Sequence, residues 1–100
     1  MRQMNEKIVC ADGFTMSVQA HGSGYCSPRV DDAPKYTAVE VGFPNQIEVL
    51  LMSFAEDETN PTDTVYGYVP VQVVTNVLAK HGGIVSGGLP PGIPYLRAPE

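Results

Sequence analysis

A thiol, an imidazole and two carboxylates lie close together along residues 21–35 of this chain. His21 precedes Cys26, and Asp31 and Asp32 follow it. A thiol, a base and a carboxylate that orients the base are the parts of a cysteine nucleophile. All of them fall in one short segment with glycine and proline, which lacks the rigid support that a productive site needs. The sequence therefore predicts no catalytic residue here and a protein that is not an enzyme.

The rest of the chain contains none of the common catalytic motifs. It has no GxSxG, no phosphate-binding GxxxxGK, no GxGxxG and no HExxH pattern. Cys10 and Cys26 form no CxxC pair, and two thiols with two distant histidines are too few and too irregularly spaced for a zinc site. A disulfide between them is disfavoured in a reducing compartment. We expect two structural thiols, no metal and no cofactor.

The same segment has the composition of a binding loop. Its glycines allow unusual backbone dihedral angles and its proline restricts the exit, so that Tyr25, Cys26 and Arg29 are presented between constrained ends. Tyrosine and arginine are enriched at binding hot spots. The alternative is a structural role, in which Tyr25 covers the core and Arg29 pairs with Asp31 or Asp32.

Composition and charge limit the classes of partner. With 43% hydrophobic and 17% charged residues, this chain of 100 residues can form a folded core. The formal net charge of −5, with only six scattered lysines and arginines, argues against nucleic-acid binding. No apolar run approaches the roughly 20 residues that span a bilayer, and the N-terminus has no apolar segment typical of a secretory signal. We expect a cytosolic protein without a membrane partner.

A β-hairpin over residues 7–20 is the strongest local prediction. Asp12 and Gly13 separate two apolar-rich runs, which is typical of a two-residue type I′ turn. A turn of this length pairs Ala11 with Phe14 and fixes the face on which each side chain lies. The predicted core face consists of Val9, Ala11, Phe14, Met16 and Val18, and the opposite face of Ile8, Cys10, Thr15 and Ser17.

Two further strands and two helices are expected. Residues 36–43 alternate with period two, and residues 64–70 form a strand with Tyr66 and Tyr68 on one face. Residues 45–54 read as an amphipathic helix, and a second helix follows Pro70 and stops at Gly82. The first helix is characterised by Asn45 and Glu48 as a capping pair and by Ile47, Leu50, Leu51 and Phe54 as its apolar stripe. The second turns Val71, Val74, Val77 and Leu78 inward.

Residues 84–100 are rich in proline and glycine, which excludes a helix and a central strand. Their apolar residues need a surface to lie on, which is their own domain, a second copy or a target. Tyr95 and Arg97 in this arm, with Tyr66 and Tyr68, complete the candidate binding residues. The predicted fold is α+β in the order β-β-β-α-β-α: about four antiparallel strands, two helices on one face, a domain over residues 1–83 and an extended arm.

Three segments, "GYCSPR", "YTAVEVGFP" and "TVYGYVPVQVV…KHGG", resemble a group of small proteins encoded by bacteriophages and prophages. The resemblance covers roughly residues 8–83 and leaves the proline-rich arm unmatched. It implies a phage accessory protein, from a class whose compact acidic members often block a host enzyme or defence complex. On this basis we expect a protein of the host cytoplasm that binds and inhibits a host protein.

Two other functions are compatible with the sequence. One is an oligomeric protein that sequesters a small anion such as a nucleotide signal, held by Gly22, Gly24, Arg29 and a tyrosine of a neighbouring copy. The other is a structural subunit that assembles through its C-terminal arm.

Overall fold

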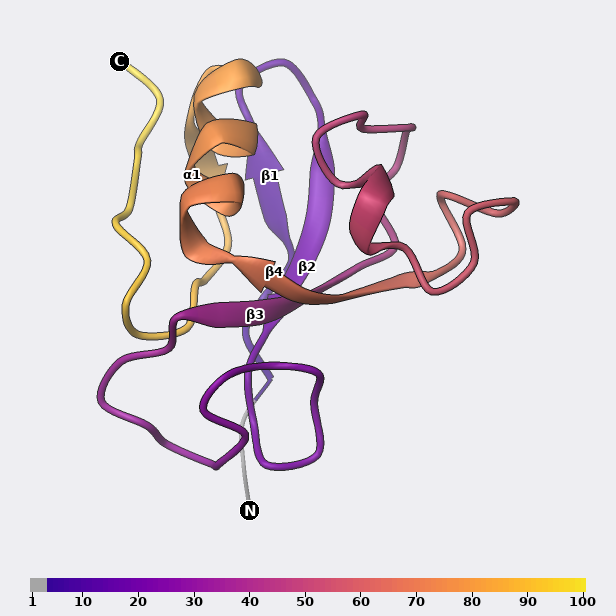
Figure 1. Cartoon of the computed structure of the whole chain (residues 1–100). Coiled ribbons are helices and arrows are strands. Elements are labelled where there is room, and N and C mark those ends of the chain that lie inside the picture. Colours follow the sequence, from indigo (N-terminus) through magenta and orange to yellow (C-terminus); the bar gives the residue numbers. More distant parts are fainter. Residues whose placement is uncertain (1–3) are drawn as a thin grey trace.

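The computed structural model describes residues 4–100 and contains a five-stranded antiparallel sheet with the order β4-β3-β2-β1-β5 (Figure 1). Its elements are β1 Ile8–Cys10, β2 Thr15–Gln19, β3 Ala38–Gly42, the 3-10 helix η1 Met52–Phe54, β4 Val65–Pro70, α1 Val71–Lys80 and β5 Ile84–Ser86. The α+β class agrees with the sequence, but the prediction of four strands and two helices was wrong. A fifth strand lies in the C-terminal segment, and only one of the two expected α-helices is present among the described residues.

The sheet is strongly twisted. Figure 1 shows β1 and β2 running steeply across β3 and β4, and α1 lying against one side of the sheet. The core lies between them and combines strand residues such as Met16 and Val41 with Val74, Val77 and Leu78 of α1. The helix α1 has ten residues. Among residues 4–100, no helix is long and apolar enough to cross a membrane. The expectation about a secretory signal rests partly on residues 1–3, which lie outside the described residues.

The hairpin has a three-residue turn where we predicted two residues. The N–H of Cys10 donates to the carbonyl of Phe14 at 2.8 Å, and the N–H of Gly13 donates to the carbonyl of Cys10 at 3.0 Å. Gly13 has a φ of +92°, as in the bulged turns that close three-residue hairpins. The longer turn slips the register by one residue, so that Ile8 lies opposite Met16.

This slip reverses the faces of β1. Ile8 and Cys10 are buried, whereas Val9 is half-buried and Ala11 is exposed, so the predicted face of this strand was wrong. The prediction for the second strand is confirmed, because Phe14, Met16 and Val18 are all buried.

Residues 45–54 do not form the predicted α-helix. The side-chain oxygen of Asn45 accepts the N–H of Thr15, and its amide nitrogen donates to the carbonyl of Gly13, both at 2.9 Å. The Glu48 carboxylate points into the core, so the capping pair does not form. Ile47 is 63% exposed. These tertiary contacts hold the segment as successive turns that end in η1.

The strand predicted over residues 36–43 is confirmed at its centre. Val39 and Val41 of β3 are buried as expected, but Phe43 lies beyond the strand with a φ of +49° and is 53% exposed. Tyr36, which we placed on the other face, precedes the strand and is buried.

A bulge in β4 separates the two tyrosines that were predicted to share a face. Val39 pairs with Val69 and Val41 pairs with Tyr66, so β4 has one residue more than β3 across this interval. Tyr66 is buried, whereas Tyr68 is 50% exposed and has a φ of +52°. The expected single tyrosine face was therefore wrong.

The helix predicted after Pro70 is confirmed as α1. Val74, Val77 and Leu78 are buried, and Val71 is half-buried. The helix ends at Lys80, just before the glycine pair at 82 and 83, as the stop signals indicated.

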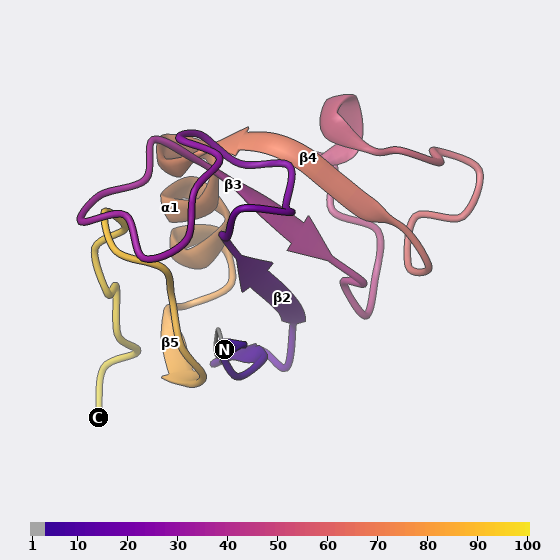
Figure 2. The ribbon, with the colours of Figure 1, turned by 90° about the horizontal axis from the view of Figure 1, so that it is seen from below.

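The C-terminal segment lies on its own domain. β5 pairs with β1, the N–H of Ile84 donates to the carbonyl of Leu96 at 2.8 Å, and Leu89 and Ile93 are buried. Figure 2 shows β5 and the C-terminal end at the opposite side of the sheet from β4. Of the three expected surfaces, which were its own domain, a second copy and a target, the structure shows its own domain.

The turn geometry predicts that Gly13→Ala destabilises the protein by about 1 kcal/mol, because alanine at a positive φ is strained even in open space. A Cβ at Gly13 would meet nothing within 4 Å, so the whole effect comes from the backbone. Urea denaturation measures it. Gly88→Ala is the control, since its Cβ would make ordinary contacts with Asn5 at a φ outside the strained range. Equal stability of both variants would contradict the assigned turn.

Candidate functional site

The loop over residues 21–35 is tied to the sheet through the backbone of Tyr25. Its N–H donates to a carboxylate oxygen of Glu40 at 3.0 Å, and its carbonyl accepts the N–H of Tyr68 at 2.9 Å. A second connection joins Ser27 to Ala38, with N–H to carbonyl at 3.0 Å. The loop therefore contacts the sheet at the bulge of β4, where the Tyr68 N–H is free to donate to it.

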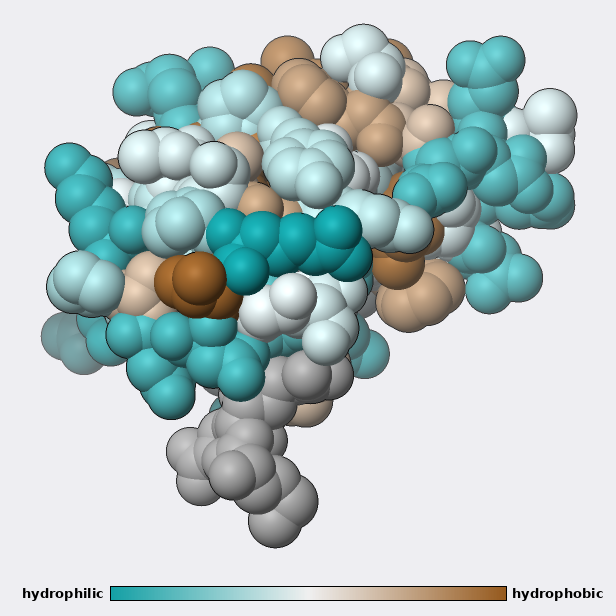
Figure 3. Space-filling view, turned by 60° about the horizontal axis from the view of Figure 1, so that its bottom comes forward, coloured by the Kyte–Doolittle hydropathy of each residue, from teal (hydrophilic) through white to brown (hydrophobic). Residues whose placement is uncertain are grey.

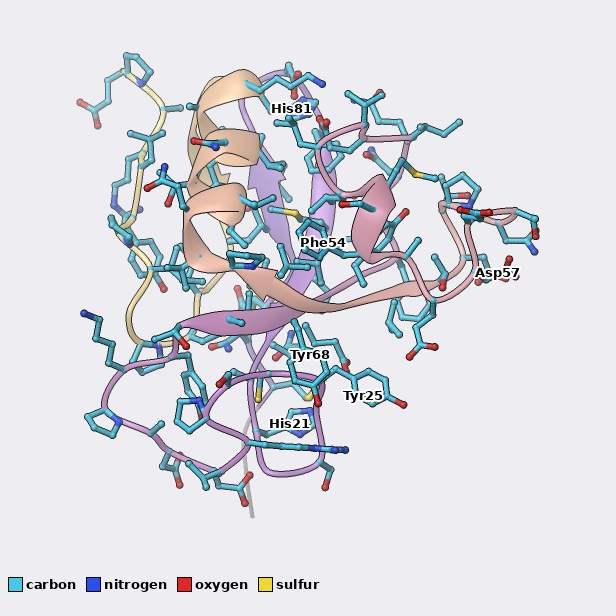
Figure 4. The ribbon with its side chains drawn as sticks, in the orientation of Figure 1. His21, Tyr25, Phe54, Asp57, Tyr68 and His81 are labelled. Atoms are coloured by element: carbon cyan, nitrogen blue, oxygen red, sulfur yellow. The ribbon has the colours of Figure 1, made fainter. Side chains whose placement is uncertain are left out.

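Tyr25, Arg29 and Tyr68 form one exposed surface, which we call the Tyr25–Arg29–Tyr68 surface. The two tyrosine rings are tilted with centroids 6.0 Å apart, and the guanidinium carbon of Arg29 lies 5.4 Å from the centroid of the Tyr25 ring. Figure 4 shows Tyr25 and Tyr68 side by side near His21. Figure 3, in which the bottom of the molecule faces forward, shows residues of intermediate hydropathy next to strongly hydrophilic ones.

Gly67 allows the loop to approach the bulge closely. A Cβ at this position would lie only 3.1 Å from the Cβ of Tyr25. Any larger residue at position 67 would displace Tyr25, so the glycine sets the distance between the two tyrosines.

The other predicted site residues do not join this surface. Cys26 is buried, and its thiol donates to the carbonyl of His21 at 3.2 Å. Tyr66 is buried with its hydroxyl donating to the carbonyl of Pro61, and burial raises the pKa of Tyr66. Tyr95 and Arg97 form a separate pair within the C-terminal segment, with the guanidinium carbon 5.3 Å from the ring centroid.

The groups that a thiol nucleophile would need have other partners. Cys26 contacts the carbonyl of His21 and not its ring, whose Nδ1 accepts the N–H of Ser23 at 3.2 Å. A carboxylate oxygen of Asp31 accepts the N–H of Gly22 at 2.7 Å. These three side chains form hydrogen bonds with the backbone of their own loop.

The glycine N–H groups that were expected to hold an anion are also engaged. Gly22 donates to Asp31, and Gly24 donates to the carbonyl of His21 at 3.1 Å. An anion at this loop would have to compete with both contacts.

The sequence reasoning missed an ionic network at the other end of the molecule, in which Glu48 and His81 are buried and Asp12 and Lys80 are about half exposed. His81 Nδ1 lies 2.6 Å from Asp12 Oδ2, and His81 Nε2 lies 2.6 Å from Glu48 Oε1. The second oxygen of Glu48 accepts from Lys80 Nζ at 2.9 Å, and the His81 ring stacks on Phe14 with centroids 4.0 Å apart. We call the four charged residues the His81 network. The one sign of this network in the sequence is Glu48, a single glutamate within an otherwise apolar run.

Hydrogen bonds hold both carboxyl groups of the His81 network ionised. Burial alone would raise the pKa of Glu48, but donation from the Leu50 N–H, Lys80 and His81 lowers it below the ordinary value. The Phe14 N–H, followed by His81, lowers the pKa of Asp12. Burial, together with the charge of Asp12, raises the pKa of the Cys10 thiol to about 11, so this thiol is not a nucleophile at neutral pH.

Among residues 4–100, no group of three or more histidine, cysteine, aspartate or glutamate side chains is arranged to hold a metal ion. The carboxylates of the His81 network are instead saturated by donors of the protein.

Comparison of the chain with protein-family models, with curated proteins and with solved structures gave no match.

The lowered pKa values of Glu48 and Asp12 predict an acid-dependent stability. The folded state binds fewer protons than the unfolded state, so the stabilisation is complete above the ordinary values of 4.5 and 3.8 and is lost as the pH falls through the lower folded values. Urea denaturation over this pH range measures the slope. Glu48→Gln should reduce the slope of the unfolding free energy against pH. Glu56→Gln, at an exposed position, should leave this slope unchanged. Equal slopes in the two variants would contradict the role given to Glu48.

Proposed function

We propose that this chain is a non-enzymatic binding protein that engages a protein partner through the Tyr25–Arg29–Tyr68 surface. The observation that carries the proposal is the stack of Arg29 on Tyr25 beside Tyr68, fixed by hydrogen bonds between loop and sheet. A surface held in place before binding loses less conformational entropy when the partner arrives.

The chemistry of the surface favours a protein partner. Tyrosine supplies a large, rigid contact area with a polar tip, and arginine supplies a planar set of donors. Arg29 donates to the carbonyl of Ser23 at a long 3.4 Å and forms no salt bridge within residues 4–100. Its guanidinium edge is therefore open to a carboxylate or carbonyl group of a partner.

The identity of the partner follows from the resemblance to phage accessory proteins. We infer a host protein in the host cytoplasm, which the chain binds and inhibits. Both cysteines are buried, which disfavours a function in thiol chemistry. Self-association through residues 84–100 is less favoured, because Ile84, Leu89 and Ile93 are buried in the chain's own core.

Alanine substitution tests the surface after a partner has been captured from host lysate and purified. Tyr25→Ala, Arg29→Ala and Tyr68→Ala should each weaken the Kd by about 30-fold, the size of a hot-spot contact. Isothermal titration calorimetry measures the Kd, and amide NMR spectra confirm that each variant is folded.

Arg97→Ala is the matched control, because Arg97 stacks on Tyr95 at almost the same distance as Arg29 on Tyr25. It should leave the Kd unchanged. If Arg97→Ala weakens binding and the three substitutions in the Tyr25–Arg29–Tyr68 surface do not, the C-terminal segment is the binding surface and the proposal is wrong.

A further inference from the structure

The loop over residues 45–50 is held at its centre by a charged side chain. Its exposed positions include Ile47 and Val49, which are 63% and 70% exposed, and Leu50, which is 39% exposed. Glu48, with 1% exposure, is the one buried residue of this loop. Apolar burial, which holds most loops to a domain, is therefore absent between Asn45 and Leu50.

Three donors converge on the Glu48 carboxylate. Its Oε2 accepts from the Leu50 N–H and from Lys80 Nζ, both at 2.9 Å, and its Oε1 faces His81 Nε2 at 2.6 Å. The charged groups around His81 are Glu48 from the loop, Lys80 from α1 and Asp12 from the hairpin turn. Asp12 also acts on the Cys10 thiol of β1. Three separate parts of the chain thus meet at one imidazole ring.

Only the imidazolium form of His81 can donate to both carboxylates, because neutral imidazole has one N–H. In that form the network contains two positive and two negative charges, and both oxygens of the buried Glu48 carboxylate and Oδ2 of the half-exposed Asp12 carboxylate have a donor. Protonation of Glu48 removes its ionic bonds to His81 and Lys80 and leaves the buried imidazolium without its buried counter-ion.

We propose that the His81 network is a pH-sensitive latch, in which the His81 imidazolium holds the loop over residues 45–50 against the domain and acid releases the loop while the sheet stays folded. The sheet and α1 are held by apolar contacts and backbone hydrogen bonds that do not involve Glu48. Regions with few buried apolar contacts open before the core does. Release of the loop frees Ile47, Val49 and Leu50, its exposed apolar residues, from their fixed positions.

The latch is independent of the proposed binding surface. Figure 4 shows His81 at the opposite end of the molecule from Tyr25 and Tyr68. Loss of one can therefore be measured without loss of the other.

Ring-nitrogen NMR spectra test the protonation state at neutral pH. His81 should show a proton on both nitrogens. His21 is the internal control, since its Nδ1 accepts a hydrogen bond and carries no proton in this arrangement. A single protonated nitrogen on His81 at neutral pH would overturn the proposal.

Amide hydrogen exchange tests the release of the loop. In Glu48→Gln, the protection of the Leu50 and Leu51 amides should fall by about tenfold or more, with no change in β3 and β4. Asp12→Asn should also loosen this loop, although Asp12 lies in the hairpin turn, because the effect passes through His81. Glu56→Gln, which removes an exposed carboxylate, should change nothing.

An acid titration of the unmodified chain decides the question even if a variant fails to fold. The Leu50 and Leu51 amides should lose protection at a higher pH than those of β3 and β4. Simultaneous loss of protection in loop and sheet, or unchanged loop protection in a folded Glu48→Gln, would show that the network is a static part of the core.

Discussion

The length of the hairpin turn over residues 11–13 determines much of this structure. Because side chains alternate along a strand, one additional residue in the turn moves Ile8 and Cys10 into the core and turns Val9 away from it. The same turn places the Asp12 carboxylate between the Phe14 N–H and His81. The register of the sheet and the His81 network therefore depend on a single local geometry.

A second irregularity, the bulge in β4, has the corresponding role at the other end of the molecule. A regular strand would turn Tyr66 and Tyr68 to the same side. The additional residue instead leaves Tyr66 in the core and Tyr68 at the surface, with its N–H directed to the carbonyl of Tyr25. The His81 network thus depends on the additional residue in the hairpin turn, and the Tyr25–Arg29–Tyr68 surface depends on the additional residue in β4.

These departures explain what the sequence could and could not predict. Some patterns that repeat over several residues were interpreted correctly, as for α1 and for Val39 and Val41, where the repeat agrees with burial in the fold. The segment over residues 45–54 has a helical spacing of apolar residues, but Asn45 has partners in the hairpin and Glu48 has partners in α1 and at His81, which no local pattern contains. The bulge likewise depends on the approach of Tyr25, more than forty positions away in the chain. Tyr25 and Arg29 could be proposed from residue type, whereas the inclusion of Tyr68 and the exclusion of Cys26 required the fold.

Both outer strands of the sheet have neighbours that occupy some of their free hydrogen-bonding groups. Along β4, Tyr68 donates to the carbonyl of Tyr25 and the carbonyl of Val65 accepts from Glu56. Along β5, Ile84 exchanges hydrogen bonds with Leu96 and Ala98. An uncovered edge strand is a template for pairing with other chains and for aggregation. The loop that carries Tyr25 and the proline-rich C-terminal segment therefore protect the folded chain from growing into a continuous intermolecular sheet.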